Sequence, residues 1–498
     1  MSKIMFSSIS IQNKKGFWIG LWVFSTYFIF FLLQAVHNYP VKIAKQIVSI
    51  QVIVGTSVFL FICITYLLVR YISGINSKGI GTKELFYLFM SLGIASFLYF
   101  AILSRGYTFL TVLHTDPKDI FMDFINSAGV GSNPYEKGVI YPPLVNVFYV
   151  SIGRFLDFSQ CATDVRNSQM GLLLYTFYNF FALSILYRQV KQFRSTVNLN
   201  ETEHTFLFVL MIFSIPMLYL IERGNSVLLA LIATMYFVQH YSSGNKVCRY
   251  KAYLALAVAG SIKIAPFILG AVLIRKVSFK ELIYAAGICL GVFLLPFIVT
   301  HGSPLDLLHN IMDATKLFQG KILTSDGQCI SLGYGVFVNS YNFYQAFERL
   351  TAIHITGVGR WLDIIGFITT SVIVSFNNRL DEYYKITLLI LLIILFPGFS
   401  NIYNLVYIFI PLILLLNKYD SEADMKYGIF FILLLFIFIP VYNMPMDWLS
   451  VYVSDKYPLT ISTVMESVSC IILFLYVYIQ SITITYKQFK WKFKKNIS

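Results

Sequence analysis

His114 to Leu144, with the sequence HTDPKDIFMDFINSAGVGSNPYEKGVIYPPL, is a polar island inside an otherwise strongly apolar chain. Its acids are Asp116, Asp119, Asp123 and Glu136. Tyr135 and Tyr141 frame its last part, and Pro142-Pro143 marks the return to apolar sequence. A protein that only anchors or scaffolds has little use for so many acids and turn formers in one place. We therefore interpret this island as a functional loop.

The composition of the rest of the chain is that of a membrane protein. Of 498 residues, 57% are hydrophobic, 17% aromatic and only 12% charged. A soluble protein of this length would need more charge to cover its surface, so we predict an all-α polytopic membrane protein. The net charge of +14 comes mainly from short Lys and Arg clusters between apolar segments. Such clusters are typical of topology determinants rather than of a nucleic-acid surface, so no nucleic-acid partner is expected.

Apolar segments and basic clusters together predict the topology. Phe17–Val36 follows a pair of lysines and is too long for the apolar region of a cleavable signal, so it is predicted as the first span, with a cytoplasmic N-terminus. Val48–Tyr71 returns, and Leu85–Leu103 crosses outward again. This order places the loop at His114–Leu144 on the extracytoplasmic face of the plasma (inner) membrane.

Later segments complete a predicted bundle of about ten to twelve transmembrane helices. They are Met170–Tyr187, Phe206–Ile221, Val227–His240, Tyr253–Ile274, Leu282–Val299, Trp361–Phe376, Ile386–Leu395, Val406–Leu416, Tyr427–Val441 and Ile461–Ile479. Leu144–Leu156 is too short to span and is predicted as a re-entrant or interfacial helix capped by the double proline. Lys263-Ile264-Ala265-Pro266 interrupts its segment, and a broken helix at membrane depth usually lines a cavity. The lysine-rich C-terminal tail is predicted to be cytoplasmic, where anionic headgroups would attract it.

The same pattern divides the chain into regions. They are 1–103, N-terminal transmembrane helices; 104–158, the extracytoplasmic loop with its short helix; 159–299, a transmembrane core with the broken helix; 300–345, a second extracytoplasmic region; and 346–498, C-terminal transmembrane helices with the basic tail.

The sequence favours neither a metal nor a cofactor. His301 and His309, with Asp306 and Asp313, are open to interpretation as metal ligands, but polar loop residues at an interface are the better interpretation. The six cysteines are scattered without a CxxC pair or metal spacing, so free thiols are expected. No GxGxxG or P-loop motif is present, so no nucleotide site is predicted.

Asp119 and Asp123 are the candidates for acid–base chemistry. They stand four residues apart, so on a helix they would share one face. A carboxylate beside a low-dielectric site has a raised pKa and suits the role of general base. The alternative is that both are solvated acids of an outer loop. The N-P-Y and Y-P-P-L sequences that follow in the same loop favour the functional interpretation.

The stretch D-I-F-M-D-F-I-N…N-P-Y…Y-P-P-L, within residues 119–144, resembles the first outer loop of polyprenol-phosphate-dependent GT-C glycosyltransferases, in particular the alpha-mannosyltransferase-like family 87. Three further similarities follow in the family's order: Arg223-Gly224-Asn225, Lys263-Ile264-Ala265-Pro266 as a K-x-x-P break, and a late Pro-led turn at Pro397–Tyr403. The chain departs from the family pattern at Asn225, where Gln is frequent, and at Asn401, where His is frequent.

The resemblance implies a GT-C bundle with an extracytoplasmic active site. It implies an enzyme that moves a hexose, most simply mannose, from a polyprenyl-phosphate donor to a lipid-linked or cell-surface glycan, with inversion and without a further cofactor. Asp119 or Asp123 would be the base. The spacing to N-P-Y favours Asp119, whereas the D-F pair favours Asp123.

Charge assigns the remaining roles. The donor phosphate needs cations, and Arg223 and Lys263 stand at breaks in apolar sequence. For Arg223 the alternative is an ion pair with Glu222 or snorkelling to the interface. The sugar or acceptor contacts are expected from Asn133, Tyr135, Tyr141, Asn225, Asn401 and Tyr403.

Two other classes of membrane protein remain alternatives. A surface-polysaccharide polymerase or ligase also has many spans, but an Arg-rich outer loop is expected there, whereas the outer loops here are led by acids. A flippase or transporter for lipid-linked sugars tends to have related halves and charges at the bilayer midplane. This sequence shows no related halves, and only Lys263 stands clearly near mid-depth.

Overall fold

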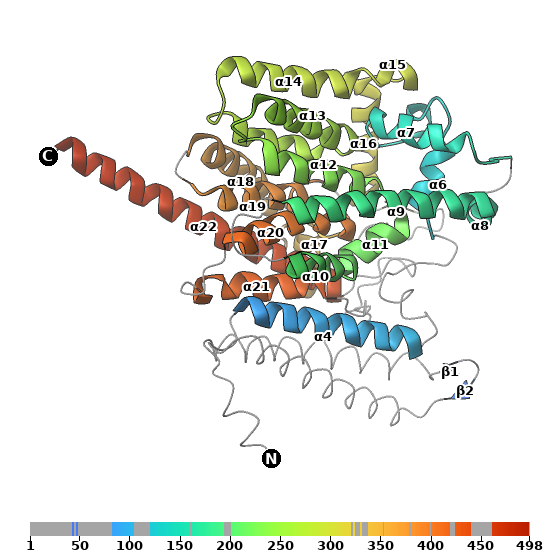
Figure 1. Cartoon of the computed structure of the whole chain (residues 1–498), viewed down its shortest axis with the longest axis horizontal. Coiled ribbons are helices and arrows are strands. Elements are labelled where there is room, and N and C mark those ends of the chain that lie inside the picture. The colour runs from blue at the N-terminus through green and yellow to red at the C-terminus, as the bar shows by residue number, and fades with distance from the viewer. Residues whose placement is uncertain are drawn as a thin grey trace.

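The computed structural model describes residues 42–43, 46–47, 82–103, 120–159, 162–193, 201–319, 322–323, 329–330, 337–351, 353–377, 380–398, 400–418, 424–439 and 461–497. These residues form a predominantly helical bundle (Figure 1). The spans predicted at Phe17–Val36 and Val48–Tyr71 lie outside the described residues, as does Asp119.

The elements follow the predicted order closely. In chain order they are β1 (Lys42–Ile43), β2 (Gln46–Ile47), α4 (Thr82–Leu103), α6 (Met122–Ala128), η2 (Tyr135–Lys137), α7 (Pro143–Gly153), α8 (Ala162–Asn167), α9 (Gln169–Gln192), α10 (Glu201–Ile212), α11 (Ile215–Arg223), α12 (Val227–His240), α13 (Lys246–Ile262), η3 (Ala265–Leu273), α14 (Phe279–Leu294), α15 (Phe297–Thr300), α16 (Pro304–Gln319), β3 (Ile322–Leu323), β4 (Cys329–Ile330), α17 (Ser340–Thr351), α18 (Thr356–Phe376), α19 (Glu382–Leu395), η4 (Ile402–Ile408), α20 (Phe409–Lys418), α21 (Asp424–Phe438) and α22 (Ile461–Ile497). β1 pairs with β2, and β3 with β4, each in antiparallel fashion.

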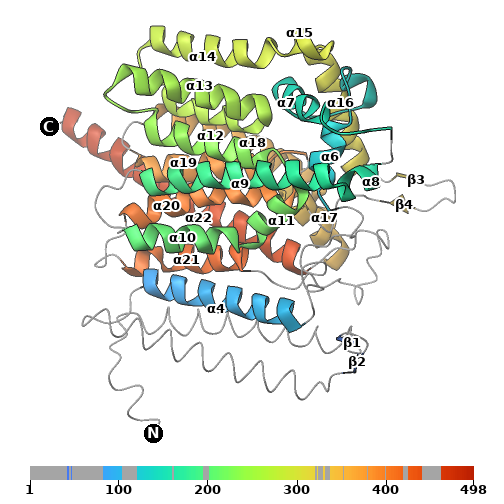
Figure 2. The same ribbon diagram turned by 45° about the vertical axis from the view of Figure 1, so that its right-hand side comes forward.

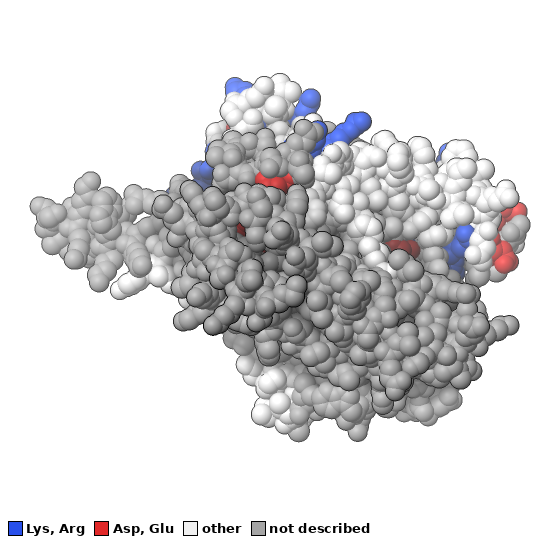
Figure 3. Space-filling model, turned by 60° about the horizontal axis from the view of Figure 1, so that its bottom comes forward, with Lys and Arg blue, Asp and Glu red and all other residues white. Residues whose placement is uncertain are grey.

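The helices have the length and surface of a membrane-embedded protein. Four helices of the described part are long and apolar enough to cross a bilayer: Gln169–Gln192, Phe279–Thr300, Thr356–Phe376 and Thr463–Tyr486. The bent pair α10 and α11 makes a fifth if it counts as one span. Their outer faces expose large apolar side chains such as Phe180 and Ile298. The described surface in Figure 3 is accordingly poor in charged side chains.

One predicted span is bent in the structure. The segment Phe206–Ile221 was expected as a single helix, but α10 and α11 meet at a bend of 61°. Ser214 is extended there, and Pro216 stands in the first turn of α11. Proline lacks the N–H that would continue the ladder of the preceding helix, so the chain restarts as a new helix. The predicted break at Lys263 is present, because α13 ends at Ile262 and η3 begins at Ala265.

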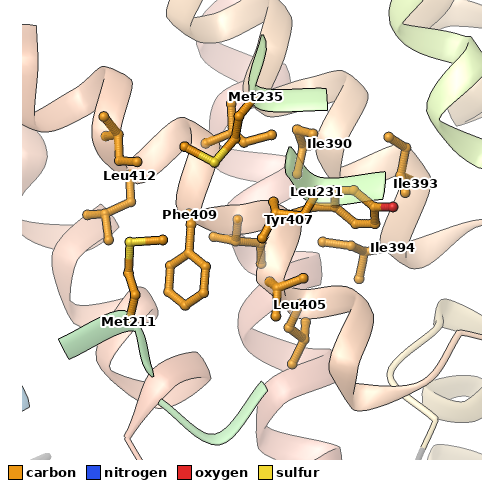
Figure 4. Packing of buried hydrophobic residues seen from close by; sticks show 14 of the residues in the cluster. Met211, Leu231, Met235, Ile390, Ile393, Ile394, Leu405, Tyr407, Phe409 and Leu412 are labelled. Atoms are coloured by element: carbon orange, nitrogen blue, oxygen red, sulfur yellow. The ribbon is translucent and has the colours of Figure 1, made fainter. Parts of the chain in front are cut away.

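The centre of the bundle is α19. Every residue from Tyr383 to Leu395 is buried, which is the pattern of a helix surrounded by other helices on all sides. Figure 4 shows its Ile390, Ile393 and Ile394 packed among side chains of α10, α12, η4 and α20. These neighbours are Met211, Leu231, Met235, Leu405, Tyr407, Phe409 and Leu412.

Short elements gather at one end of the bundle. α6, α7, α8, α15 and α16 lie together at the right of Figure 1, and the C-terminus lies at the opposite side. The 45° turn of Figure 2 keeps the same grouping. α12, α13 and α14 lie side by side in both views and pack against one another. The polar island of the sequence therefore covers one end of the helices.

Gly153, the last residue of α7, lets this helix approach α6 closely. A Cβ at Gly153 would lie 2.2 Å from the backbone oxygen of Ala128, the last residue of α6. At Gly287 on α14, in contrast, a Cβ would meet nothing within 4 Å.

We predict that Gly153→Ala lowers the temperature of thermal unfolding, whereas Gly287→Ala leaves it unchanged or slightly raised. Overpacking against backbone costs about 1–3 kcal/mol, and alanine is the better helix former. Purified protein in detergent, followed by far-UV circular dichroism, provides the measurement. Equal unfolding temperatures for the two variants would contradict the close approach of α6 and α7.

Candidate functional site

Asp123 is held in the first turn of a short helix at this end of the bundle. α6 begins at Met122, and its N-cap residue Phe121 has a left-handed backbone with φ of 60°. The backbone N–H of Phe121 donates to the carbonyl of Glu222 at 3.1 Å, and its ring stacks on Tyr175 with centroids 3.6 Å apart. The start of α6 is thus tied to the end of α11. Asp119, the other predicted base, lies outside the described residues.

Both carboxylate oxygens of Asp123 are engaged. Nη2 of Arg223 donates to Oδ1 at 3.0 Å, and Nδ2 of Asn225 donates to Oδ2 at 2.6 Å. The side chains of Arg223 and Asp123 are 15% and 13% exposed. Charge-assisted bonds of this kind are stronger than neutral ones. An ionised carboxylate has about four acceptor positions, so Asp123 keeps capacity for a further donor.

The turn between α11 and α12 presents two of these partners. Gly224 terminates α11 in the left-handed conformation, with φ of 60° and ψ of 35°. A side chain there would be strained, and its Cβ would lie 2.7 Å from Cβ of Phe124. Oδ1 of Asn225 accepts from the N–H of Val227 at 3.0 Å and so caps the start of α12. The Arg-Gly-Asn order therefore places a guanidinium and an amide on either side of a tight turn.

Tyr141 connects this turn to the broken helix. Its hydroxyl accepts a hydrogen bond from Nδ2 of Asn225 at 3.2 Å. Nζ of Lys263 lies 4.4 Å from the ring centroid of Tyr141 and 5.8 Å from that of Tyr403, within the range of cation–π attraction. Tyr403 in turn stacks on Tyr219, with centroids 6.0 Å apart. Burial raises the pKa of Tyr141 well above its usual range, so its hydroxyl stays protonated.

The structure thus brings together six of the predicted site residues. They are Asp123, Tyr141, Arg223, Asn225, Lys263 and Tyr403, and we call them the Asp123 cluster. They come from all four segments that resemble the glycosyltransferase family, which are separated by more than one hundred residues in places. The structure shows an ion pair of Arg223 with Asp123, 3.0 Å apart.

Three other predicted contact residues lie in supporting positions. Tyr135 is buried, and its hydroxyl donates to the carbonyl of Tyr141 at 3.1 Å. Nδ2 of Asn133 donates to Glu136 at 3.4 Å in an exposed part of the loop. Asn401 forms an isolated antiparallel bridge with Phe337. Each of these contacts shapes a loop. None of the contacts described for these three residues is with Asp123.

No cluster of metal ligands is present in the part of the chain that the structure describes, taking groups of three or more His, Cys, Asp or Glu. Of the residues considered as metal ligands, His309 lies 3.5 Å from Asp313, and both side chains are more than half exposed. Asp306 accepts hydrogen bonds from the N–H and hydroxyl of Ser303 at 2.8 and 2.7 Å, as a helix-start motif does.

Three tyrosines that sequence reasoning missed hold the turn. The hydroxyls of Tyr175, Tyr149 and Tyr178 donate to the carbonyls of Ile221 at 2.5 Å, Gly224 at 3.0 Å and Asn225 at 3.0 Å. The sequence carried one signal for this, since Tyr175 and Tyr178 are three residues apart on a predicted helix and share a face. In a chain with 34 tyrosines, that signal does not separate internal tyrosines from those at the lipid interface.

The basic helix ends lie opposite the Asp123 cluster. α12 begins beside Asn225 and runs away to His240, after which α13 returns from Lys246 to Lys263. Near the start of α13, Arg249 pairs with Glu281 at 2.8 Å. The end of α9 reaches the end of α12, where Gln239 donates to the carbonyl of Gln192. One helix length therefore separates the cluster from these basic segments.

The described part of the chain is that of an all-α membrane protein. A largely buried polar cluster lies at one end of its helices. No family model, curated protein or solved structure matches the chain. The function is therefore inferred from the site residues themselves.

We predict that Asp123 and Arg223 are energetically coupled. Asp123→Asn and Arg223→Gln each leave a partly buried charge without its partner. The double variant should therefore lose less stability than the sum of the losses in the two single variants. Contacting residues show coupling energies of about 0.5–3 kcal/mol. Thermal unfolding of the wild type, both single variants and the double variant measures this coupling.

The exposed pair Asp313 and Lys316, 3.0 Å apart, serves as the control. The same cycle with Asp313→Asn and Lys316→Gln should give a coupling near zero, because exposed ion pairs contribute about 0–1 kcal/mol. Additive effects at Asp123 and Arg223 would contradict the ion pair.

Proposed function

We propose that the protein is a membrane glycosyltransferase that moves a hexose from a polyprenyl-phosphate donor to a lipid-linked or cell-surface glycan. Mannose is the simplest sugar that the family resemblance implies. The observation that carries the proposal is that Asp123 lies in direct contact with Arg223 and Asn225, with Lys263 and two tyrosines in the same cluster. An inverting transfer needs a base for the acceptor hydroxyl, and cations stabilise the phosphate that leaves.

Asp123 supplies the base of the reaction. Its carboxylate accepts the proton of the acceptor hydroxyl as the hydroxyl oxygen attacks the anomeric carbon of the donor sugar. The bond from the anomeric carbon to the phosphate oxygen breaks, and polyprenyl phosphate leaves with that electron pair. Asn225 and Arg223 hold the carboxylate in place, which fixes its distance from the acceptor.

Arg223 supplies donors for the phosphate. Its Nη2 binds Asp123, whereas its Nε–H is buried and has no hydrogen-bond partner among the described residues. A buried donor without a partner costs about 1–3 kcal/mol, and a phosphate oxygen would satisfy it. A phosphate oxygen bound to Nε, next to the Nη2 that binds Asp123, would bring the base and the leaving group together.

Lys263 and the aromatic rings complete the substrate contacts. The ammonium of Lys263 lies over the ring of Tyr141 and is a donor of charge-assisted hydrogen bonds to a phosphate oxygen. The rings of Tyr141 and Tyr403 offer apolar faces to a sugar. These roles extend the resemblance to the glycosyltransferase family, whose K-x-x-P break and late turn correspond to the segments of Lys263 and Tyr403.

The position of the cluster agrees with a lipid-linked donor. If the basic helix ends face the cytoplasm, as the positive-inside pattern indicates, the cluster faces the opposite side of the plasma membrane. Nucleotide sugars are absent there, so the donor must arrive on a lipid. We propose the same GT-C arrangement of about ten to twelve spans for the whole chain.

We predict that Asp123→Asn abolishes transfer. The assay uses purified protein in nanodiscs, radiolabelled polyprenyl-phosphate mannose or glucose as donor, and native lipid extract as acceptor. Loss of a general base typically lowers the rate about 10²–10⁴-fold. Asp119→Asn is tested alongside, and Asp313→Asn on the surface serves as the matched control.

Retained transfer in Asp123→Asn would overturn the role of Asp123 as the base. Retained transfer in both Asp123→Asn and Asp119→Asn, or no transfer from either donor by the wild type, would overturn the proposed mechanism as a whole. The transporter alternative would be supported instead if a lipid-linked sugar crossed the bilayer, and if this movement required Lys263 but neither Asp119 nor Asp123.

We predict that Lys263→Met weakens binding of polyprenyl phosphate about 10–150-fold, the equivalent of one charge-assisted hydrogen bond of about 1.5–3 kcal/mol. Lys263→Arg should retain most of the affinity, because the positive charge is kept. Lys316→Met, far from the cluster on an exposed face, is the control. Binding is measured by microscale thermophoresis, and equal affinity of Lys263→Met and the wild type would exclude Lys263 from the phosphate site.

A further inference from the structure

α16 has one face packed on the protein. Leu307 is 2% exposed and forms a small core with Tyr135 and Phe297. On the same side, Ile311 packs against this core. Nδ2 of Asn310 donates to the carbonyls of Tyr135 and Val139 at 2.9 and 3.1 Å. The inner face of α16 therefore holds the loop that leads to Tyr141.

The outer face of α16 is split into an apolar and a charged stripe. Leu305, Leu308 and Met312 are 75%, 52% and 52% exposed, and their spacing of three and four residues aligns them on one side of the helix. Beside them runs a second exposed stripe, which consists of Asp306, His309, Asp313 and Lys316. A helix in water would have no reason to separate its exposed residues in this way.

The apolar stripe follows directly on a membrane span. The span Phe279–Thr300 exposes Ile298 and Val299 near its end, by 74% and 61%. His301 then ends the span with a left-handed backbone of φ 48°. α16 begins three residues later, so its exposed apolar side chains continue a lipid-facing surface across a sharp turn.

We propose that α16 lies flat in the headgroup boundary of the bilayer, with Leu305, Leu308 and Met312 in the acyl region and the charged stripe in water. A helix of its 16 residues is about 24 Å long, which is shorter than the hydrocarbon core, and its charged stripe opposes insertion across it. Separation of an apolar and a charged face is the property of interfacial helices. The partner of the stripe is therefore membrane lipid rather than a second copy of the chain.

This placement has a consequence for the loop. Because Asn310 binds the carbonyls on both sides of η2, α16 fixes the loop at the depth of the lipid boundary. That is the depth at which a lipid-linked phosphate is presented to the Asp123 cluster, a point that rests on the proposed function. The placement of α16 itself does not depend on any activity.

Two neighbouring substitutions test the placement. Leu308→Trp and His309→Trp are both at exposed positions, so both variants are expected to fold. Each is reconstituted in nanodiscs whose lipids carry bromine near the headgroup end of the acyl chain. The tryptophan fluorescence of each variant is measured, and that of the wild-type protein is subtracted to give the emission of the introduced residue. This emission is compared in lipids with and without bromine, and with and without acrylamide in the water.

Bromine should roughly halve the added emission of Leu308→Trp and hardly change that of His309→Trp, which acrylamide should quench instead. Equal quenching of both variants by bromine would overturn the proposal, because it would mean that the helix is immersed in the bilayer. Quenching of neither by bromine would also overturn it, and shielding of both from acrylamide would then indicate a protein partner.

Discussion

The ion pair between Asp123 and Arg223 joins the polar loop to the helical bundle, and the geometry of the site depends on it. Asp123 belongs to a helix of seven residues that could not keep its position alone. It is held because Phe121 binds the end of α11, and because Arg223 and Asn225 together occupy both carboxylate oxygens. One short turn thus provides the anchor for the loop and the partners of its carboxylate.

Rigidity around that turn comes from neutral groups. Three tyrosine hydroxyls bind three successive parts of its backbone, and Gly224 alone has the freedom to close it. The carbonyls at the end of a helix would otherwise lack partners in an apolar surrounding. The cost of burying charge is met by pairing Asp123 with Arg223 and by placing Lys263 over aromatic rings. Nε of Arg223 is buried and has no hydrogen-bond partner among the described residues, which supports the proposal of an anionic ligand at this turn.

Much of this arrangement was predictable from the sequence. The length of the apolar segments predicts helices, and the segments that resemble the glycosyltransferase family carry charged residues at turns and helix breaks. The helix at Val227–His240 and the break at Lys263 follow the prediction closely. The bend at Ser214 was missed because the segment is apolar throughout and Pro216 alone marks it. The supporting role of Tyr135 depends on its hydrogen bonds with the carbonyl of Tyr141 and with Nδ2 of Asn146 in α7, which no periodic pattern encodes.

The most direct test of the central claim is a cryo-electron microscopy map of the protein in nanodiscs with bound polyprenyl phosphate. The claim is that the Asp123 cluster is one site for a lipid-linked phosphate. We expect density for the phosphate within hydrogen-bond distance of the Nε of Arg223 and of Nζ of Lys263, with the prenyl chain leading toward the bilayer. Phosphate density at another part of the molecule, with the Asp123 cluster unchanged and empty, would contradict the account.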